Sequence, residues 1–388
     1  MKPPVFNTTY PAIDDLRNKA RKRIPRFAFK YLDGGCNEDV NLEKNTRELR
    51  DIELKPYYIR PFNGISMQTQ LLGQTYSAPF GIAPIGLQGL IWPQAPQILA
   101  RAAAEANIPF ILSTVTTTSI EEIAQITSGK CWYQLYHPAE AAITENILQR
   151  LEAAGINVLV LLCDVPSFGF RPRDIRNGLA MPPKMTLSNI LQILTKPNWA
   201  IRTLLNGTPQ FATMKPYMPK GMSMKQLGLF MNRTFSGRLD EQKIAKLRDR
   251  WKGKLVLKGV VTVEDTETAH RLGLDGVIVS NHGGRQLDAG ESSIQSLLPI
   301  AAQFKGKLSI MMDSGLRSGP DIARALAAGA EFVFLGRTFM YGVAALGKAG
   351  GAHTIGLLQT QLKQVMEQLN CANVQLLPHH LKQLKLPA

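Results

Sequence analysis

The stretch LSIMMDSGLRSGPDIARALAAGAEFVFLGR (residues 308–337) decides the fold. It contains two apolar runs, 308–313 and 332–335, with a helical pattern at 320–328 between them. Short apolar runs that alternate with helices are typical of parallel strands whose two faces are both buried. The stretch therefore predicts a strand–helix–strand unit of the α/β class.

The same alternation extends back to residue 80. The other predicted strands lie at 80–83, 110–113, 131–136, 158–164, 255–258 and 276–280, with helical patterns at 97–106, 139–154 and 264–272. Eight such units fit a closed (β/α)8 TIM barrel. An open doubly wound sheet is the alternative, which is disfavoured because no G-x-G-x-x-G follows the first strand. We therefore expect a mostly helical N-terminal segment at 1–78 and a barrel at 79–388.

One connection, after the fourth predicted strand, is far longer than the others. It holds a basic, Met-rich insertion at about 175–239, with nine Lys or Arg, no Asp or Glu, and seven of the 13 methionines. Patterns at 188–194 and 199–205 predict two short amphipathic helices broken by Pro197. The insertion either packs on the barrel surface or sits on an anionic membrane, and residues alone do not decide between these.

The net charge of +15 predicts an anionic partner. Nucleic acid is not expected, because no zinc finger, basic zipper or RNA-binding strand motif is present. The N-terminal MKPPVFNTTY lacks the apolar core of a signal peptide, and the longest apolar run, 158–163, is too short to span a bilayer. The four cysteines form no C-x-x-C pair, which favours reduced thiols over disulfides or a metal site. We expect a cytoplasmic protein.

Polar groups follow nearly every predicted strand. Side chains at the carboxyl ends of barrel strands converge on one mouth. The residues at these ends are Ala83, Pro84, Ile85, Gly86, Ser113, Thr114, Gln134, Tyr136, Asp164, Lys258, Ser280, Asn281, His282, Arg285, Asp313, Arg317, Gly336 and Arg337. Such a concentration of polar residues predicts an active site at the mouth.

The last two strand ends indicate a phosphate site. D-S-G-L-R-S-G (313–319) precedes a helix, and L-G-R-T (335–338) lies on the neighbouring strand. Backbone N–H groups at Gly315, a helix N-terminus and an arginine can bind a dianion, although a single glycine is more often an ordinary turn. Lys258 forms either a structural ion pair or a cation that stabilises charge on a cofactor.

The stretch S-N-H-G-G-R-Q-L-D (280–288) carries the candidate chemistry. His282 can take a proton near neutral pH, and Arg285 can hold a carboxylate by two parallel hydrogen bonds. Asp164 can orient the imidazole. Residues alone thus indicate a barrel enzyme with a phosphate-bearing cofactor, an acidic substrate and a histidine base.

This stretch resembles the signature of the FMN-dependent L-2-hydroxy acid dehydrogenases and oxidases. The resemblance covers essentially the whole chain. Its other motifs are IPRFAFKYLDGG (24–35), APIGL (83–87), LST (112–114), YQLY (133–136), CDVP (163–166), LKGV (257–260), DSGLR (313–317) and LGR (335–337).

The resemblance implies oxidation of an L-2-hydroxy acid to the 2-oxo acid. His282 would remove the proton of the C2 hydroxyl while the hydrogen on C2 passes to flavin N5. Asp164 would pair with His282, and Lys258 would stabilise the reduced flavin. Tyr136 would hydrogen-bond the substrate hydroxyl. The substrate contacts would be Tyr31, from the N-terminal segment, with Tyr136, Arg171 and Arg285.

The resemblance also implies the cofactor contacts. The backbone of Ala83, Pro84 and Ile85 would lie along the flavin. Ser113, Gln134, Lys258 and Ser280 would contact the isoalloxazine ring. The ribityl chain and phosphate would be held by Asp313, Gly315, Arg317, Gly336 and Arg337.

Four positions depart from the commonest family pattern or separate its branches. Leu162 replaces a frequent threonine, so one flavin hydrogen bond is expected to be missing. Ser314 replaces the second residue of D-G-G, as in the lactate dehydrogenase branch. Val115 replaces a bulky tryptophan and leaves room for substrates larger than glycolate. Gly86 resembles the dehydrogenases, whereas many oxidases carry alanine there.

The insertion resembles the membrane-associating segment of bacterial lactate and mandelate dehydrogenases. That likeness favours a lactate-like or mandelate-like substrate, a peripheral position on the inner face of the cell membrane, and quinone as electron acceptor. It also implies a homotetramer. The main alternative is a soluble oxidase that passes its electrons to O₂.

Overall fold

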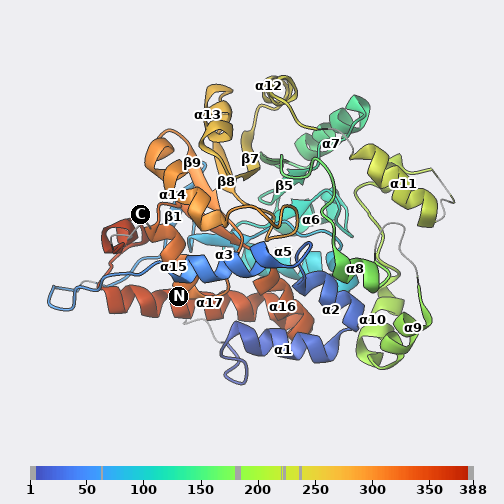
Figure 1. Ribbon diagram of the computed structural model, residues 1–388, viewed down its shortest axis with the longest axis horizontal. Helices are drawn as coiled ribbons and strands as arrows, with labels where there is room; N and C mark the ends of the chain where they lie inside the picture. The colour runs from blue at the N-terminus through green and yellow to red at the C-terminus, as the bar shows by residue number, and fades with distance from the viewer. Residues whose placement is uncertain are drawn as a thin grey trace.

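Eight parallel strands form the centre of the molecule (Figure 1). The computed structural model describes residues 6–382 except 63, 180–184, 220, 222–223 and 236–237. The strands are β3 (Phe80–Ile82), β4 (Ile111–Ser113), β5 (Trp132–Leu135), β6 (Val158–Leu162), β7 (Lys254–Val260), β8 (Gly276–Val279), β9 (Ser309–Met312) and β10 (Phe332–Leu335). Their order in the sheet is β3-β10-β9-β8-β7-β6-β5-β4.

The two edges of this sheet meet. A parallel bridge joins Ile82 to Phe110, and the Ile82 N–H donates to the Pro109 carbonyl at 2.9 Å. All eight predicted strands are therefore present and the predicted barrel is confirmed. Strands such as β6, whose five residues are all buried, read as continuous apolar runs because both faces of a barrel strand are covered.

A helix follows each strand and covers the outside of the barrel. These helices are α5 (Ala95–Glu105), α6 (Ile120–Thr127), α7 (Ala141–Ala153), α12 (Glu241–Arg250), α13 (Val263–Arg271), α14 (Ser293–Phe304), α15 (Gly319–Ala327) and α16 (Arg337–Leu346). Several begin at a hydroxyl cap: Ser119, Thr262, Ser292 and Ser318 each accept a hydrogen bond from the backbone N–H three residues later. The predicted helices agree with these apart from a residue or two at the ends.

The N-terminal segment is less helical than predicted. It contains α1 (Ile13–Arg23), α2 (Arg26–Asp33) and α3 (Val40–Arg50), but residues 69–76 form a hairpin of β1 (Thr69–Leu71) and β2 (Gln74–Tyr76). Leu72 and Gly73 both have positive φ, which suits the tight turn of a hairpin. Leu71 and Tyr76 belong to the apolar cluster inside the barrel, so the hairpin closes one end of it.

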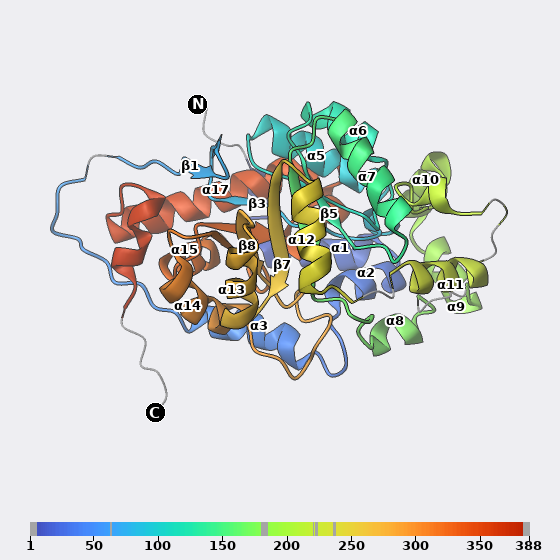
Figure 2. The same ribbon diagram turned by 90° about the horizontal axis from the view of Figure 1, so that it is seen from above.

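The remaining C-terminal elements pack on the outside. They are η2 (Gly347–Ala349), α17 (Gly350–Leu369) and η3 (Val374–His380), and α17 lies against α15 and α16. Helix α1 also packs on α16 (Figure 1), and α15 lies beside α17 in the view of Figure 2. Asp33 joins three of these helices, because it pairs with Arg17 at 2.7 Å and accepts a hydrogen bond from Tyr341 at 2.7 Å. The four cysteines are free thiols.

The insertion between β6 and α12 forms α8 (Pro172–Arg176), α9 (Leu187–Leu194), α10 (Pro197–Asn206), η1 (Lys215–Tyr217) and α11 (Met224–Thr234). The two short helices predicted at 188–194 and 199–205 are present as α9 and α10, and Pro197 separates them by occupying the first position of α10, where a missing N–H costs nothing. Trp199 is buried, packs edge-on against Phe27, and donates to the Ile91 carbonyl at 3.0 Å. These contacts attach α9 and α10 to the body of the protein.

The insertion has an exposed part and a buried part. Leucine and isoleucine side chains of α9 and α10 are open to solvent, whereas four later apolar residues of the insertion are buried and Leu229 of α11 is exposed. The exposed set is Leu187, Ile190, Leu191, Leu194, Ile201, Leu204 and Leu205, and the buried set is Phe211, Met214, Met231 and Phe235. No helix in the described part of the chain has the length and apolar character needed to cross a membrane.

Candidate active site

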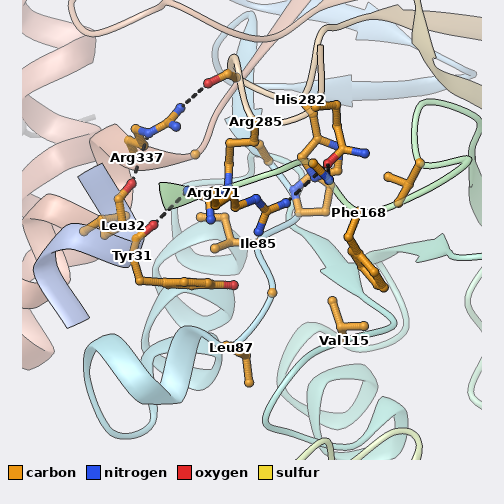
Figure 3. A pocket seen from close by; sticks show the side chains of 18 of the residues that line it. Tyr31, Leu32, Ile85, Leu87, Val115, Phe168, Arg171, His282, Arg285 and Arg337 are labelled. Atoms are coloured by element: carbon orange, nitrogen blue, oxygen red, sulfur yellow. Dashed lines mark hydrogen bonds between the residues drawn. The ribbon is translucent and has the colours of Figure 1, made fainter. Parts of the chain in front are cut away.

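A cavity of about 460 Å³ lies at the carboxyl ends of the barrel strands (Figure 3). Most of the predicted site residues line it: Tyr31, Ala83, Pro84, Ile85, Gln134, Tyr136, Arg171, Lys258, His282, Arg285, Asp313, Gly315, Arg317, Gly336 and Arg337. Asp164, Ser113 and Ser280 do not line it. They are held behind its wall, where Ser280 Oγ accepts hydrogen bonds from Lys258 Nζ at 2.9 Å and from the His282 N–H at 3.1 Å.

His282 is held in a strained loop directly after β8. Its φ is 59°, and Gly283 and Gly284 continue with φ of 67° and 69°. A histidine in this left-handed region costs free energy, and such strain clusters at functional sites. A Cβ atom on Gly284 would lie 2.5 Å from the backbone nitrogen of Leu42, so the loop also needs glycine there to pack against α3.

Asp164 orients the imidazole of His282. The Nδ1 atom lies 3.1 and 3.2 Å from the two carboxylate oxygens, which makes Nδ1–H the donor and leaves the lone pair on Nε2. Burial lowers the pKa of His282 below its ordinary value, although Asp164 opposes this shift. Burial raises the pKa of Asp164, but His282 and Lys258 outweigh it and the pKa is lowered. The pair is therefore a neutral imidazole beside a carboxylate.

Lys258 is buried at the wall of the cavity and forms an ion pair with Asp313 at 3.0 Å. Burial alone would lower the pKa of Lys258, but Asp313 and Asp164 outweigh it and raise the pKa above its ordinary value. The residue therefore keeps its charge. The structural ion pair expected from the sequence is present, and the ammonium group still lines the cavity.

Arg285 crosses from the loop after β8 to the end of α2. Its Nη1 donates to the carbonyls of Tyr31 at 2.8 Å and Gly34 at 2.7 Å, and its guanidinium lies 5.0 Å from the centre of the Tyr31 ring. The buried Nη2 has no hydrogen-bond partner among the described residues and lies 3.6 Å from Asp174. Burial, with the neighbouring Arg171, lowers the pKa of Arg285 to about 10. An anionic ligand would relieve both penalties.

Gln286 was not predicted as a site residue, yet it connects the two loops at this end of the cavity. Its Nε2 donates to the carbonyls of Asp164 and Ser167, both at 3.0 Å. Its Oε1 accepts from Arg171 Nη2 at 3.3 Å and from the Gly169 N–H at 3.2 Å. Gln286 thus positions Arg171 beside His282 and Arg285, as Figure 3 shows. Its place in the stretch 280–288 was the available signal.

The opposite end of the cavity is formed by the turns after β9 and β10. Arg337 donates to the carbonyls of Leu32 at 3.0 Å, Gly283 at 2.9 Å and Gly34 at 2.8 Å. Burial, with Arg317 nearby, lowers the pKa of Arg337 to about 9. Within the described residues, these three bonds leave two of its five N–H groups for a ligand.

This end fits the phosphate of FMN. Among the described residues, Arg317 Nη1 donates to the carbonyl of Leu316, at 2.8 Å, and α16 begins at Arg337 with its N-terminus at the cavity. Two partly buried cations and a helix N-terminus, with no carboxylate in an ion pair with either arginine among the described residues, can bind an anion. The cavity continues from there past Lys258 to His282, as an elongated cofactor requires.

The insertion contributes a wall that was not predicted. Phe211, Met231 and Asn232 line the cavity, and Phe235 packs edge-on against Tyr136 with ring centres 5.6 Å apart. Burial raises the pKa of Tyr136, so its phenol stays protonated and can donate a hydrogen bond. Composition did not distinguish these residues from the exposed part of the same segment.

Known proteins resemble the chain over nearly its full length. A family model described as FMN-dependent dehydrogenase matches residues 20–383. The L-lactate dehydrogenase of Pectobacterium atrosepticum is 38% identical over 356 residues, 92% of each chain. The L-lactate dehydrogenase of Xanthobacter autotrophicus is 37% identical over 353 residues, 91% of each chain.

Solved structures agree. The monotopic membrane protein (S)-mandelate dehydrogenase matches with a TM-score of 0.90 and 34% identity, over 96% of this chain and 98% of that chain. Mandelate oxidase matches with a TM-score of 0.82 and 29% identity, over 95% and 97%. The barrel and its mouth thus define a flavin-dependent oxidoreductase. The chain belongs to the FMN-dependent dehydrogenase family, among the enzymes that oxidise L-2-hydroxy acids, which confirms the resemblance.

Proposed function

We propose that the protein oxidises an L-2-hydroxy acid with an apolar side chain, of the lactate or mandelate type, to the 2-oxo acid. The observation that carries this proposal is that His282, held by Asp164 through Nδ1, lies beside Arg171 and Arg285 in one cavity. His282 Nε2 takes the proton of the C2 hydroxyl. The resulting imidazolium is stabilised by the Asp164 carboxylate.

The substrate carboxylate binds between Arg285 and Arg171. Nη2 of Arg285 and Nε of Arg171 have no hydrogen-bond partner in the part of the chain that the structure describes, and this carboxylate would accept hydrogen bonds from both. Tyr136 donates a hydrogen bond to the substrate oxygen, and Tyr31 closes the same end of the cavity. Fixing the acid at both ends aligns its C2 atom for reaction.

The cofactor is held along the rest of the cavity. FMN, when bound, accepts the hydrogen from C2 together with two electrons. Arg317 and Arg337 bind its phosphate, Asp313 its ribityl chain, and Lys258 lies beside its ring as a positive charge. The backbone at 83–85 and the amide of Gln134 line the same space.

The side chain of the substrate meets an apolar wall. Leu87, Val115, Phe211 and Met231 line the cavity and offer no hydrogen bond to a polar substituent. A panel of glycolate, L-lactate, L-2-hydroxy-4-methylpentanoate and (S)-mandelate, monitored anaerobically by bleaching of the flavin absorbance, tests this. We expect faster reduction by the apolar substrates than by glycolate. Reduction by glycolate alone, or by D-isomers equally well, would contradict the proposal.

Peripheral membrane binding and electron transfer to quinone complete the proposal. The exposed apolar residues of α9 and α10, and the likeness to a protein described as monotopic, support it. Stopped-flow reoxidation of the reduced enzyme should be fast with a quinone analogue and slow with O₂. The reverse order would favour the oxidase alternative.

A further inference from the structure

A second cavity, of about 320 Å³, lies between α2, α8 and α9, apart from the active site. It is lined by Arg26, Lys30, Arg173, Arg176, Asn177, Ser188 and Gln192. Four of these side chains are cationic and none is acidic. In Figures 1 and 2, α8 and α9 stand on the side of the molecule where the insertion projects from the barrel.

The positive charge of this cavity is mostly unpaired. Arg173 forms ion pairs with Asp39 and, at 3.8 Å, with Asp33. Within the part of the chain that the structure describes, no carboxylate pairs with Arg26, Lys30 or Arg176. The cations also stand at spacings of four and three residues along α2 and α8. Like charges so spaced repel each other, and an anion between them would remove that cost.

Helix α9 joins this cavity to the exposed apolar surface. Ser188 and Gln192, one turn apart, face the cavity, and Gln192 Nε2 donates to Ser188 Oγ at 3.2 Å. Leu187, Leu191 and Leu194 form a stripe about a third of a turn around the same helix, and each is more than three-fifths exposed. An anion in the cavity would therefore lie beside side chains able to enter the acyl region of a bilayer.

We propose that this cavity binds the phosphate group of an anionic phospholipid while the stripe on α9 enters the bilayer. A phosphate accepts charge-assisted hydrogen bonds from Arg26, Lys30 and Arg176, and the lipid chains continue toward the stripe. This inference rests on the peripheral membrane association proposed above. Free phosphate has the same headgroup chemistry, but it would gain nothing from the adjacent leucines.

Vesicle co-sedimentation of the FMN-loaded protein tests this inference. The vesicles are phosphatidylcholine alone and about three parts phosphatidylcholine to one part phosphatidylglycerol. The variant is Arg26→Gln/Arg176→Gln. Its matched control is Lys19→Gln/Arg21→Gln, which removes equal charge from exposed positions of the neighbouring α1. Because one cation near an anionic surface contributes about fivefold in partitioning, we expect the cavity variant to lose about 30-fold on the mixed vesicles.

The possible results distinguish the phospholipid site from the more general membrane association on which it rests. The control should lose clearly less than the cavity variant, and both should retain activity in solution. Equal losses would show diffuse attraction and overturn the binding site. Release by inorganic phosphate at constant ionic strength, without preference between the two vesicles, would assign the cavity to free phosphate and overturn the lipid.

Leu187→Ser/Leu191→Ser tests the membrane association itself. These changes should weaken binding to both kinds of vesicle, because they remove apolar area without touching charge. If the wild-type protein binds neither vesicle, the membrane association fails, and the lipid site fails with it.

Discussion

The two ends of the active-site cavity use the same residue type for different purposes. Arg337 and Arg285 are both partly buried, and the loss of solvation lowers the pKa of each, to about 9 and about 10. Arg337, at the start of α16, donates hydrogen bonds to three backbone carbonyls. Among the described residues, Arg285 Nη2 has no hydrogen-bond partner, and the residue lies beside His282. In the proposed function, the first end would hold the cofactor phosphate permanently, and the second would bind the substrate carboxylate beside the base.

The groups around Arg337 and Arg285 therefore differ in a way that suits the first to holding a bound anion and the second to binding an anion beside a base. At the end proposed to bind the phosphate, the donors are arginines held by backbone carbonyls, and the described residues place no histidine beside them. At the substrate end, a loop of left-handed residues places a neutral imidazole against a carboxylate. Substitutions at the phosphate end should therefore mainly weaken FMN binding, whereas substitutions at the substrate end should mainly affect binding and oxidation of the hydroxy acid.

The largest effect should come from the residue that only the reacting end has. His282→Gln removes the base but preserves size and polarity. We expect the rate of flavin reduction by substrate to fall by about 10⁴-fold, because proton transfer from the hydroxyl loses its acceptor. Anaerobic stopped-flow absorbance measures this, with FMN content as the control. Rapid reduction in this variant would remove His282 from the mechanism.

Arg317→Met tests the holding end. Among the described residues, the side chain of Arg317 makes one hydrogen bond, to the carbonyl of Leu316, whereas that of Arg337 makes three, so the Arg317 variant tests phosphate binding with less structural damage. We expect the dissociation constant for FMN, measured by fluorescence titration of the apoprotein, to rise about 100-fold. The thermal midpoint of the apoprotein should hardly move. An unchanged FMN affinity would show that the phosphate lies elsewhere.

Arg285→Lys tests whether the substrate end needs the bidentate hydrogen bonding of a guanidinium or only a positive charge. A lysine cannot stack on Tyr31, donate to two carbonyls and bind a carboxylate in a bidentate manner. We expect KM for the hydroxy acid to rise about 30-fold, with the FMN content retained. If FMN is lost while KM stays constant, the two ends have been assigned the wrong way round.

Gln286→Leu should give the smallest effect. Gln286 touches neither proposed ligand in our assignment but ties Arg171 to the loop that carries Asp164. We expect about a tenfold loss in kcat/KM, mostly through KM, since Arg171 loses its orientation. Gln286→Glu keeps the acceptor for Arg171 and should recover part of the loss. Equal damage in both variants would indicate a purely structural role.

The barrel was predictable from the sequence because its strands are covered on both faces. Runs such as VLVLL at 158–162 are apolar throughout, and a parallel strand buried on both faces is one of the few elements in which every residue of a short run must be apolar. The site was predictable because the barrel brings all strand ends together. His282, Arg285 and Lys258 could therefore be grouped before any contact was known.

The environment of the apolar residues in the insertion and the presence of the hairpin at 69–76 could not be predicted from the sequence. The sequence at 211–235 is rich in methionine and aromatic residues, and this composition does not tell which of these side chains face solvent and which face the active site. Only the tertiary structure shows that Phe211 and Met231 line the cavity while Leu204 is exposed. The hairpin at 69–76 is too short for its period to be distinguished from a loop, and it is stabilised by the barrel interior that it fills.

If His282 acts as a neutral base held by Asp164, the rate of flavin reduction should depend on pH in a defined way. Burial lowers the pKa of His282 below its ordinary 6.5, so the base form is already present at pH 6.5. The second-order rate constant of reduction, from anaerobic stopped-flow, should stay constant above that pH and fall only as pH drops through a lower pKa. In Asp164→Asn the fall should move to still lower pH, because the carboxylate raises the pKa of His282. A fall centred above pH 6.5, or none at any acidic pH, would contradict the account.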